Sequence, residues 1–276
     1  YDAIAERHEP GRTVVVGSTL AVGARIAHEK LGVPMATLHL QPAVLRSVYD
    51  TPVLPGPPVH RLPRPVKRIA MRLAEHAADR MAAPAINHLR HDVGLPPIRR
   101  VFRSWWESPR LVLGLFPAWF APPQPDWPRA ARLAGFPLFD THEQAELGDD
   151  LQRFLAAGPP PIVLTPGSAN RHAADFFAAG CRAAERLNLR ALLLTRFPEQ
   201  LPSPLPPGSF HAAYAPLSRI LSRCAALLHH GGIGTLSQGF AADIPQLIMP
   251  MAHDQFDNAA RAERLGVARW LPRRRF

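Results

Sequence analysis

The sequence predicts an α/β protein built on parallel β-sheets, and three observations lead to this fold class. The apolar run 13–18 is followed by a helical pattern at 21–32 and by a second apolar run at 34–40, which is the β-α-β order of a parallel sheet. The same alternation returns between residues 161 and 265. Gly-Ser or Gly-Gly pairs end several of the apolar runs, as is typical of strand-to-helix turns. We therefore expect two α/β domains in one chain.

A segment with acidic residues and proline, beginning FPLFDTHEQAELGDD, separates the two halves. With 276 residues, of which 47% are hydrophobic and 20% charged, the chain is long enough to bury two cores. We place the boundary in this segment, which gives an N-terminal domain at 1–141 and a C-terminal domain at 142–276. In the first domain, proline and glycine fill the loop 51–65. A long helical pattern follows at 66–93, which Pro84 must bend or break.

The composition indicates a folded protein without a nucleic-acid partner. The net charge is +10, and the cations are arginines except for Lys30 and Lys67. Because the arginines are scattered and no basic helix or RNA-binding aromatic motif occurs, nucleic-acid binding is disfavoured. Cys181 and Cys224 are far apart and flanked by apolar residues, which predicts buried, reduced thiols and a cytoplasmic location. No apolar run has the length of a membrane span.

The stretch HHGGIGTLSQG, which begins at His229, follows an apolar run and precedes a helical pattern. A metal site is disfavoured because His229 and His230 point to opposite faces of a strand and no CxxC or HExxH partner is present. A dinucleotide-binding turn is disfavoured because Ser237 occupies the third glycine position after Gly232 and Gly234. Two interpretations remain: an anion site at a helix N-terminus, or a tight turn without chemistry.

Two further strand-to-helix turns carry polar side chains. The turn MAHDQFDN offers Asp254 and Gln255, whose oxygens and amide suit sugar hydroxyls, and we expect Asp257 to cap the helix that follows. The turn TPGSAN contains Gly167 and Ser168, which could contact a phosphate or cap a helix. Because ligands of parallel sheets bind at the carboxyl ends of the strands, all three turns are candidates for one site.

Histidines and tryptophans outside these turns allow more than one role. Three histidines of the long helical segment are expected to be solvated: His76, His88 and His91. Three tryptophans are expected in a core, or in the lining of a pocket for an apolar substrate: Trp105, Trp106 and Trp119.

The segment AYAPLSRILSRCAALLHHGGIGTLSQGFAADIPQLIMPMAHDQFDNAARAERLG resembles the donor-binding region of family 1 glycosyltransferases. The stretches VVVGSTLAVGARIAHEKLGVP, LFPAWFAPPQPDWPR and GFPLFD resemble the rhamnosyltransferase B subunits of rhamnolipid synthesis. The resemblance implies the GT-B fold, in which two Rossmann-like domains with parallel sheets follow one another. It also implies a glycosyltransferase.

The reaction implied by the resemblance is metal-independent transfer, with inversion, of a hexose such as rhamnose. The donor would be a dTDP or UDP sugar and the acceptor a hydroxyl of an apolar or lipid molecule, with no further cofactor. The location implied is cytoplasmic, with peripheral association at the inner membrane as an option. Two alternatives stay open: a glucosyltransferase acting on a sterol, polyketide or other small aglycone, and a non-catalytic fragment that binds nucleotide sugars.

The resemblance also assigns donor contacts residue by residue. Tyr214 would stack on the nucleobase, the Ala215 backbone would bond it, and Gln238 stands where many members carry a ribose-binding glutamate. Asp254 and Gln255 match the pair that holds the donor sugar. The phosphate contacts implied are Ser168, His230, Gly232, Gly234 and Thr235.

No catalytic residue is assigned from the sequence. The base of the resembling family is a histidine in a Gly-rich turn after the first strand of the N-terminal domain, whereas the first strand expected in this chain, TVVVGS, resembles a later strand of that domain. The chain begins without Met and stops at LPRRRF, just after an expected strand start. We therefore expect a fragment that lacks both termini and the base, and we do not assign that role to His28 or His39.

Overall fold

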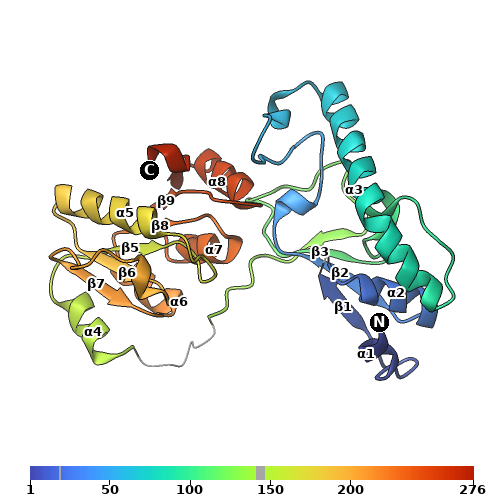
Figure 1. The fold of residues 1–276 in the computed structure, drawn as a ribbon, viewed down its shortest axis with the longest axis horizontal. Helices are drawn as coiled ribbons and strands as arrows, with labels where there is room; N and C mark the ends of the chain where they lie inside the picture. Colours follow the sequence, from blue (N-terminus) through green and yellow to red (C-terminus); the bar gives the residue numbers. More distant parts are fainter. Residues whose placement is uncertain (19, 141–146) are drawn as a thin grey trace. The chain divides into compact units, whose positions relative to one another are not determined.

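The computed structural model describes residues 1–18, 20–140 and 147–276. Its internal contacts divide the chain into unit 1, Tyr1–Gly135, and unit 2, Phe136–Phe276. Each unit is an α/β structure with one parallel sheet, so the predicted fold class is confirmed (Figure 1). The domain boundary that the sequence predicts between residues 141 and 142 lies outside the described residues.

The sheet of unit 1 has four parallel strands in the order β1-β2-β3-β4. These strands are β1 (Val15–Ser18), β2 (Met35–His39), β3 (Val112–Gly114) and β4 (Ala131–Leu133). A short helix, α1 (Asp2–Ala5), precedes β1, and α2 (Val22–Leu31) joins β1 to β2. Helix α2 ends at Gly32, whose φ of 70° is left-handed and therefore favours glycine. The strands predicted near 13–18 and 34–40 are confirmed.

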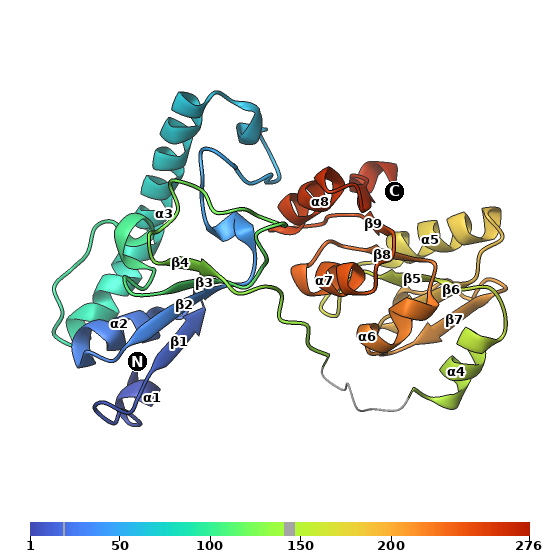
Figure 2. The same cartoon turned by 180° about the vertical axis from the view of Figure 1, so that it is seen from behind.

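The longest element of unit 1 is α3 (Arg64–Asp92), which has 29 residues and continues through Pro84 (Figure 2). The helix is not broken there. Pro84 and Arg80 are both exposed, so the Arg80 carbonyl that loses its helical partner can be hydrated. The opposite side of α3 packs Ile86 against Trp105 in the core of unit 1.

The prediction for the histidines of this helical segment is borne out. The three histidines expected in solvent are all exposed: His76, His88 and His91. Among the described residues, no helix is both long and apolar enough to cross a membrane.

Unit 2 has a six-stranded parallel sheet in the order β10-β9-β8-β5-β6-β7. The strands are β5 (Ile162–Thr165), β6 (Ala191–Leu194), β7 (Ser209–Ala212), β8 (Ala226–His229), β9 (Gln246–Ile248) and β10 (Ala268–Trp270). The helices are α4 (Asp149–Ala156), α5 (Ala174–Arg186), α6 (Leu217–Ile220), α7 (Ile233–Ala241) and α8 (Gln255–Arg264). The chain runs from β5 outward to β7, then crosses back to β8 and runs outward to β10. The sheet therefore reverses direction of growth between β5 and β8.

Alternation along the strands divides the core of unit 2 into two layers. On β5, Leu164 joins a cluster with Phe176 and Phe177 of α5, whereas its neighbour Val163 joins a cluster with Leu151 of α4 and Ile220 of α6. The two cysteines are free and buried, one in each layer, which confirms the thiols expected from the sequence: Cys181 and Cys224.

We predict that Pro84→Ala stabilises unit 1. Proline in a helix interior costs about 3 kcal/mol relative to alanine, and the exposed position offers no packing to offset that cost. The expected gain in the free energy of unfolding is about 1–3 kcal/mol, measured by urea denaturation. Tryptophan fluorescence reports on unit 1, since every tryptophan except Trp270 lies there.

The matched control is Ala85→Gly, one residue further along the exposed side of α3. It should lower the free energy of unfolding by about 1 kcal/mol, which calibrates helix propensity at this point. A loss of stability in Pro84→Ala would mean that the packing of α3 requires the geometry that proline imposes.

Candidate functional site

A pocket of about 520 Å³ lies at the carboxyl ends of the central strands of unit 2. It is lined by the turns that follow β5, β8 and β9, and by Arg273 near the end of the chain. Strands β5 and β8 pair directly, with Thr165 opposite His229, so their turns emerge side by side. Because this is the point where the strand order reverses, it is the position at which open α/β sheets bind ligands.

The turn after β8 is fixed by backbone conformation and by a side chain of α8. Gly231 has φ 90°, and a Cβ there would lie 2.9 Å from Ile248 Cγ2 and 3.0 Å from the Gln255 carbonyl oxygen. Asn258 Nδ2 donates a hydrogen bond of 3.0 Å to the Gly231 carbonyl oxygen. Only glycine fits this position, and the asparagine locks the turn to α8.

The imidazole of His230 lies between two glycines. A Cβ on Gly167, which has φ 94°, would lie 2.8 Å from His230 Nε2, and a Cβ on Gly232 would lie 2.4 Å from the same atom. The Nδ1 atom of His230 is buried and has no hydrogen-bond partner among the described residues. Burial lowers the pKa of His230 to about 4, so the ring is neutral near pH 7. A neutral ring can still donate one hydrogen bond to a ligand.

Its neighbour His229 has a different environment. His229 is fully buried, burial lowers its pKa to about 3, and its Nδ1 accepts a hydrogen bond of 3.1 Å from the Gly231 amide. His229 does not line the pocket. The interpretation of the two histidines as a paired metal site remains disfavoured, and no group of three or more metal-ligating side chains occurs within the described ranges.

The amino end of α7 opens into the pocket. Its N-cap is Gly232, no described side chain caps it, and the first intrahelical bond runs from the Leu236 amide to the Gly232 carbonyl at 2.9 Å. The amides before Leu236 therefore lack helical partners and carry the positive end of the helix dipole. A Cβ on Gly234 would meet no described atom within 4 Å. Glycine here leaves the first turn of the helix open to a ligand.

The turn after β9 is held together by the pair expected to bind a sugar. Gln255 Oε1 accepts hydrogen bonds from the amides of Met251 at 2.8 Å and Ala252 at 3.0 Å. Asp254 Oδ2 accepts one of 2.7 Å from Asn258 Nδ2. Of the pair, Gln255 lines the pocket and Asp254 does not.

The prediction that Asp257 caps α8 is wrong. The N-cap residue is Asp254, and Asp257 lies within the helix, buried to 2% exposure. Its carboxylate accepts a hydrogen bond of 2.7 Å from Nε of Arg261, one turn further on and equally buried. The ion pair with the guanidinium gives the buried carboxylate the partner that it needs inside the helix.

The predicted donor contacts divide into two groups. Six of them line the pocket: Ser168, His230, Gly232, Gly234, Thr235 and Gln255. Four do not: Tyr214, Ala215, Gln238 and Asp254. Tyr214 is 46% exposed at the turn after β7, whereas Ala215 belongs to the core beside α4 and α6 and Gln238 is buried one turn into α7.

Three polar lining residues were missed by sequence reasoning: Asn170, His172 and Arg273. Asn170 ends the TPGSAN turn, where its Oδ1 accepts a hydrogen bond of 2.9 Å from the His172 amide. Asn170 and His172 lie close to Ser168 in the sequence, and this position could have suggested both residues. Arg273 comes from the end of the chain, where it pairs with Asp175 at 3.3 Å, and no local pattern indicates that position.

Comparison with known proteins adds an independent result. Residues 191–275 match the family described as erythromycin biosynthesis protein CIII-like, C-terminal domain. The chain is 34% identical over 193 residues to the O-mycaminosyltylonolide 6-deoxyallosyltransferase of Streptomyces fradiae, which covers 66% of this chain and 43% of the relative. It is 30% identical over 275 residues to the vancomycin aglycone glucosyltransferase of Amycolatopsis orientalis, which covers 97% of this chain and 64% of the relative.

Solved structures agree on the fold. The glycotransferase of kitacinnamycin has a TM-score of 0.72 at 20% identity, covering 100% of this chain and 67% of its own. Glycosyltransferase VinC, solved in complex with dTDP, has a TM-score of 0.65 at 22% identity, covering 100% and 63%. The chain is therefore related in sequence to glycosyltransferases and has their GT-B fold, as the sequence resemblance implied. It spans less than two thirds of the length of both curated relatives named above.

We predict that His230 makes the stability of unit 2 depend on pH. Since its pKa is about 4 in the folded chain and about 6.5 when unfolded, the unfolded chain takes up the proton first as the pH falls. Stability from the neutral ring is complete above pH ~6.5 and is lost towards pH ~4, by up to about 1.4 kcal/mol per pH unit. His230→Gln lacks this loss.

The measurement is the difference in unfolding free energy between the parent chain and His230→Gln, from urea denaturation at several pH values. The largest part of the His229 contribution, which comes from burial, is present in both proteins and cancels in the difference. A difference that stays constant between pH ~7 and ~4.5 would show that the ring is not buried in its neutral form.

Proposed function

We propose that the protein transfers a sugar from a nucleotide diphosphate to a hydroxyl of an apolar acceptor. The observation that carries the proposal is the open amino end of α7 with the neutral imidazole of His230 beside it, both in one pocket at the switch point of the sheet. Such a site suits a diphosphate, because backbone amides and one ring N–H can bond its oxygens. The relatives named as glycosyltransferases support the same reaction class.

In this proposal the pocket of unit 2 holds the donor. Gly234, Thr235 and Ser168 contact the phosphates, and Gln255 reaches the sugar from the turn after β9. Tyr214, which is exposed beyond β7, provides a ring for the nucleobase. VinC was solved with dTDP, which makes dTDP the first nucleotide to test.

The chemical step we propose is a direct displacement with inversion. The acceptor oxygen attacks the anomeric carbon as the bond to the diphosphate breaks, and the acceptor proton passes to a base that we do not assign to this chain. Negative charge grows on the leaving diphosphate, where the amides of α7 and His230 stabilise it. Stabilisation of this kind requires no metal ion.

The acceptor is proposed as a small aglycone. The names of the relatives favour this alternative, since one acts on the vancomycin aglycone and another on O-mycaminosyltylonolide. Rhamnose as the sugar, a lipid as the acceptor and association with the inner membrane depend on the sequence resemblance alone. Transfer assays with dTDP-rhamnose, dTDP-glucose and UDP-glucose separate these possibilities, and binding without transfer would indicate a binding fragment.

We predict that the chain binds dTDP or UDP and that two substitutions weaken this binding. His230→Ala removes a charge-assisted hydrogen bond, so the affinity should fall about tenfold to a hundredfold. Gly234→Ala places a methyl group where the chain leaves open space, so it should fold normally and yet lower the affinity about tenfold or more. Isothermal titration calorimetry measures both effects.

Gly148→Ala is the control, because Gly148, like Gly234, lies at the start of a helix with open space around it, but it is the N-cap of α4, away from the pocket. It should bind like the parent. Equal affinity of Gly234→Ala and Gly148→Ala would place the nucleotide elsewhere and remove the basis of the proposal.

A further inference from the structure

Unit 1 contains a second, apolar pocket that the donor site does not explain. Its volume is about 780 Å³, within the range of small-molecule sites. One wall is formed by residues from the end of β2 and the loop 51–59, and the other by α3 together with Phe102 and Trp106. Apolar side chains that line it include Leu20, Leu38, Leu40, Leu54, Val59 and Trp106. The pocket role considered for the tryptophans is thus borne out for Trp106.

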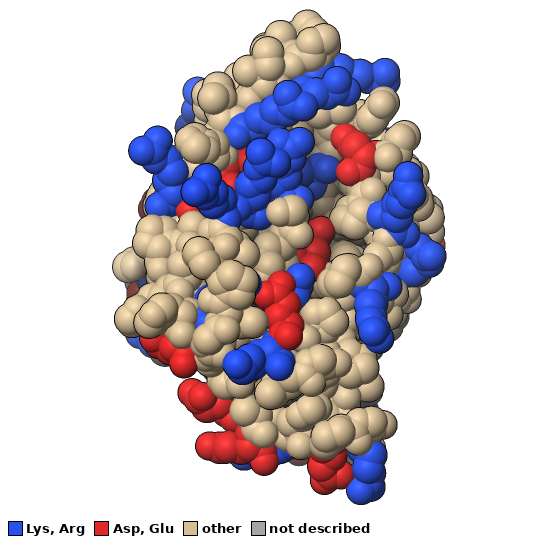
Figure 3. Space-filling model, turned by 90° about the vertical axis from the view of Figure 1, so that its right-hand side faces the viewer, with Lys and Arg blue, Asp and Glu red and all other residues tan. Residues whose placement is uncertain are grey.

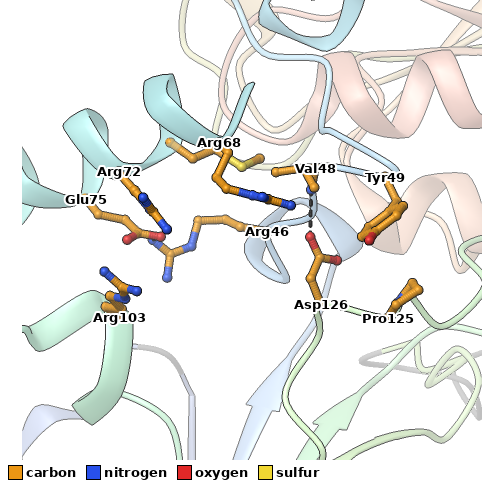
Figure 4. Close-up of a pocket in the computed structure, with 10 residues that line it drawn as sticks. Arg46, Val48, Tyr49, Arg68, Arg72, Glu75, Arg103, Pro125 and Asp126 are labelled. Carbon is orange, nitrogen blue, oxygen red and sulfur yellow. Dashed lines mark hydrogen bonds and ion pairs between the residues drawn. The ribbon is translucent and has the colours of Figure 1, made fainter. Parts of the chain in front are cut away.

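Next to the apolar pocket lies a smaller one of about 290 Å³, and the two share Arg46, Met71 and Glu75 as lining residues. We call four of its side chains the arginine cluster: Arg46, Arg68, Arg72 and Arg103. They come from three separate segments, the loop after η1 (Pro42–Val44), α3 and η3 (Val101–Trp105). Figure 4 shows the guanidinium groups of Arg46, Arg72 and Arg103 close together around Glu75, whereas that of Arg68 extends towards Val48 and Asp126.

Arg46 is the fixed member of the arginine cluster. Its Nη1 atom lies 3.1 Å from Glu75 Oε1, its Nη2 donates to the Phe102 carbonyl oxygen, and its guanidinium lies 5.6 Å from the centre of the Trp106 ring. Arg46 also lines both pockets. It therefore marks the junction between the apolar pocket and the cations.

The other three members carry unbalanced charge. Within the described part of the chain, Arg68, Arg72 and Arg103 have neither a hydrogen bond nor an ion pair through their side chains. The nearby carboxylate of Asp126 is engaged by neutral donors, at 2.6 Å from Ser47 Oγ and 2.8 Å from the Val48 amide. Figure 3 shows cationic side chains gathered on the upper part of the face that it presents.

We propose that unit 1 binds an amphiphile that has an apolar body and an anionic group, a carboxylate or a phosphate. The body occupies the apolar pocket, and the anionic group is held by Arg68, Arg72 and Arg103, with Arg46 at the junction. Planar guanidinium groups suit both kinds of anion because each can form two parallel hydrogen bonds. The role of this molecule as the acceptor of sugar transfer rests on the proposed function. Its binding to unit 1 does not.

The chemistry of the two parts predicts different dependences. Each buried methylene contributes about 0.8 kcal/mol, so affinity should rise about fourfold per carbon of the chain until the pocket is filled. The three arginines are exposed, so their contribution is screened by salt and is modest for each side chain. Together they should favour an anionic over a neutral head group by about tenfold at low ionic strength.

The experiment measures binding of decanoate, dodecanoate, dodecyl phosphate and dodecanol to the full chain by calorimetry, below the concentrations at which micelles form. We expect both anions to bind about tenfold more tightly than dodecanol, and dodecanoate more tightly than decanoate. The triple variant Arg68→Gln/Arg72→Gln/Arg103→Gln should lose the preference for anions and keep the dependence on chain length. Ala74→Trp, which fills the apolar pocket from α3, should weaken all four.

A charge-matched control separates the arginine cluster from the overall positive charge. It carries three exposed substitutions in unit 1 that line neither pocket: Arg61→Gln, Arg80→Gln and Arg99→Gln. This control should keep the preference for anions. An equal loss in both triple variants would overturn the assignment of the anion to the arginine cluster.

Two other results would also overturn the proposal. Equal affinity for dodecanol and dodecanoate would show that the site does not recognise an anionic group. Binding to anionic vesicles without binding to the monomeric amphiphiles would indicate that the ligand is a membrane surface. The proposed donor function is tested separately by dTDP binding in unit 2. Amphiphile binding without dTDP binding would support the amphiphile site of unit 1 and contradict the proposed glycosyl transfer. Binding of dTDP without amphiphile binding would support the donor site and contradict the amphiphile site.

Discussion

The pocket of unit 2 depends on the close approach of one imidazole to two glycines on neighbouring turns. Strands β5 and β8 pair in register, so Gly167 and His230 emerge together although they are far apart in the sequence. A side chain at Gly167 or Gly232 would overlap the His230 ring. Glycine at both positions allows the His230 ring to lie beside the amino end of α7, where the unpaired backbone amides are. The local sequences TPGS and HHGG therefore form one site together, because the glycines of both make room for the same histidine ring.

This arrangement supplies positive potential without a buried cation. Burial keeps His230 neutral, with its pKa at about 4, because a charged ring would lose its hydration with no carboxylate to compensate. The unpaired amides of α7 carry fixed partial charges that need no counter-ion. In the proposed function, a diphosphate meets dipoles already oriented towards it, and preorganised dipoles of this kind stabilise charge that develops on a leaving group.

The sequence predicted the parts of the molecule that depend on local patterns. Apolar periodicity located the strands, and polar or glycine-rich strand ends located the three turns that line the pocket of unit 2. The sequence-based prediction failed for Asp257. An N-cap and a position three residues into a helix differ only in where the helix begins, and the local pattern does not fix that residue. The buried pair of Asp257 with Arg261 is seen only in the folded structure. The arginine cluster could not be predicted, since Arg46, Arg72 and Arg103 meet only through the packing of three distant segments.

The pocket of unit 2 and the pocket of unit 1 are built from different kinds of structure, and this difference indicates which of the two can vary in ligand specificity. The match to the CIII-like family covers 191–275, which lies wholly in unit 2, where the pocket is built from backbone turns that tolerate little change. The pocket of unit 1 is built from side chains of α3 and of loops, which can be exchanged without disturbing the sheet. Arg68, Arg72 and Arg103 are exposed and engaged in no described ion pair, so stability does not explain their convergence. The proposed recognition of a charged group on an apolar molecule accounts for it.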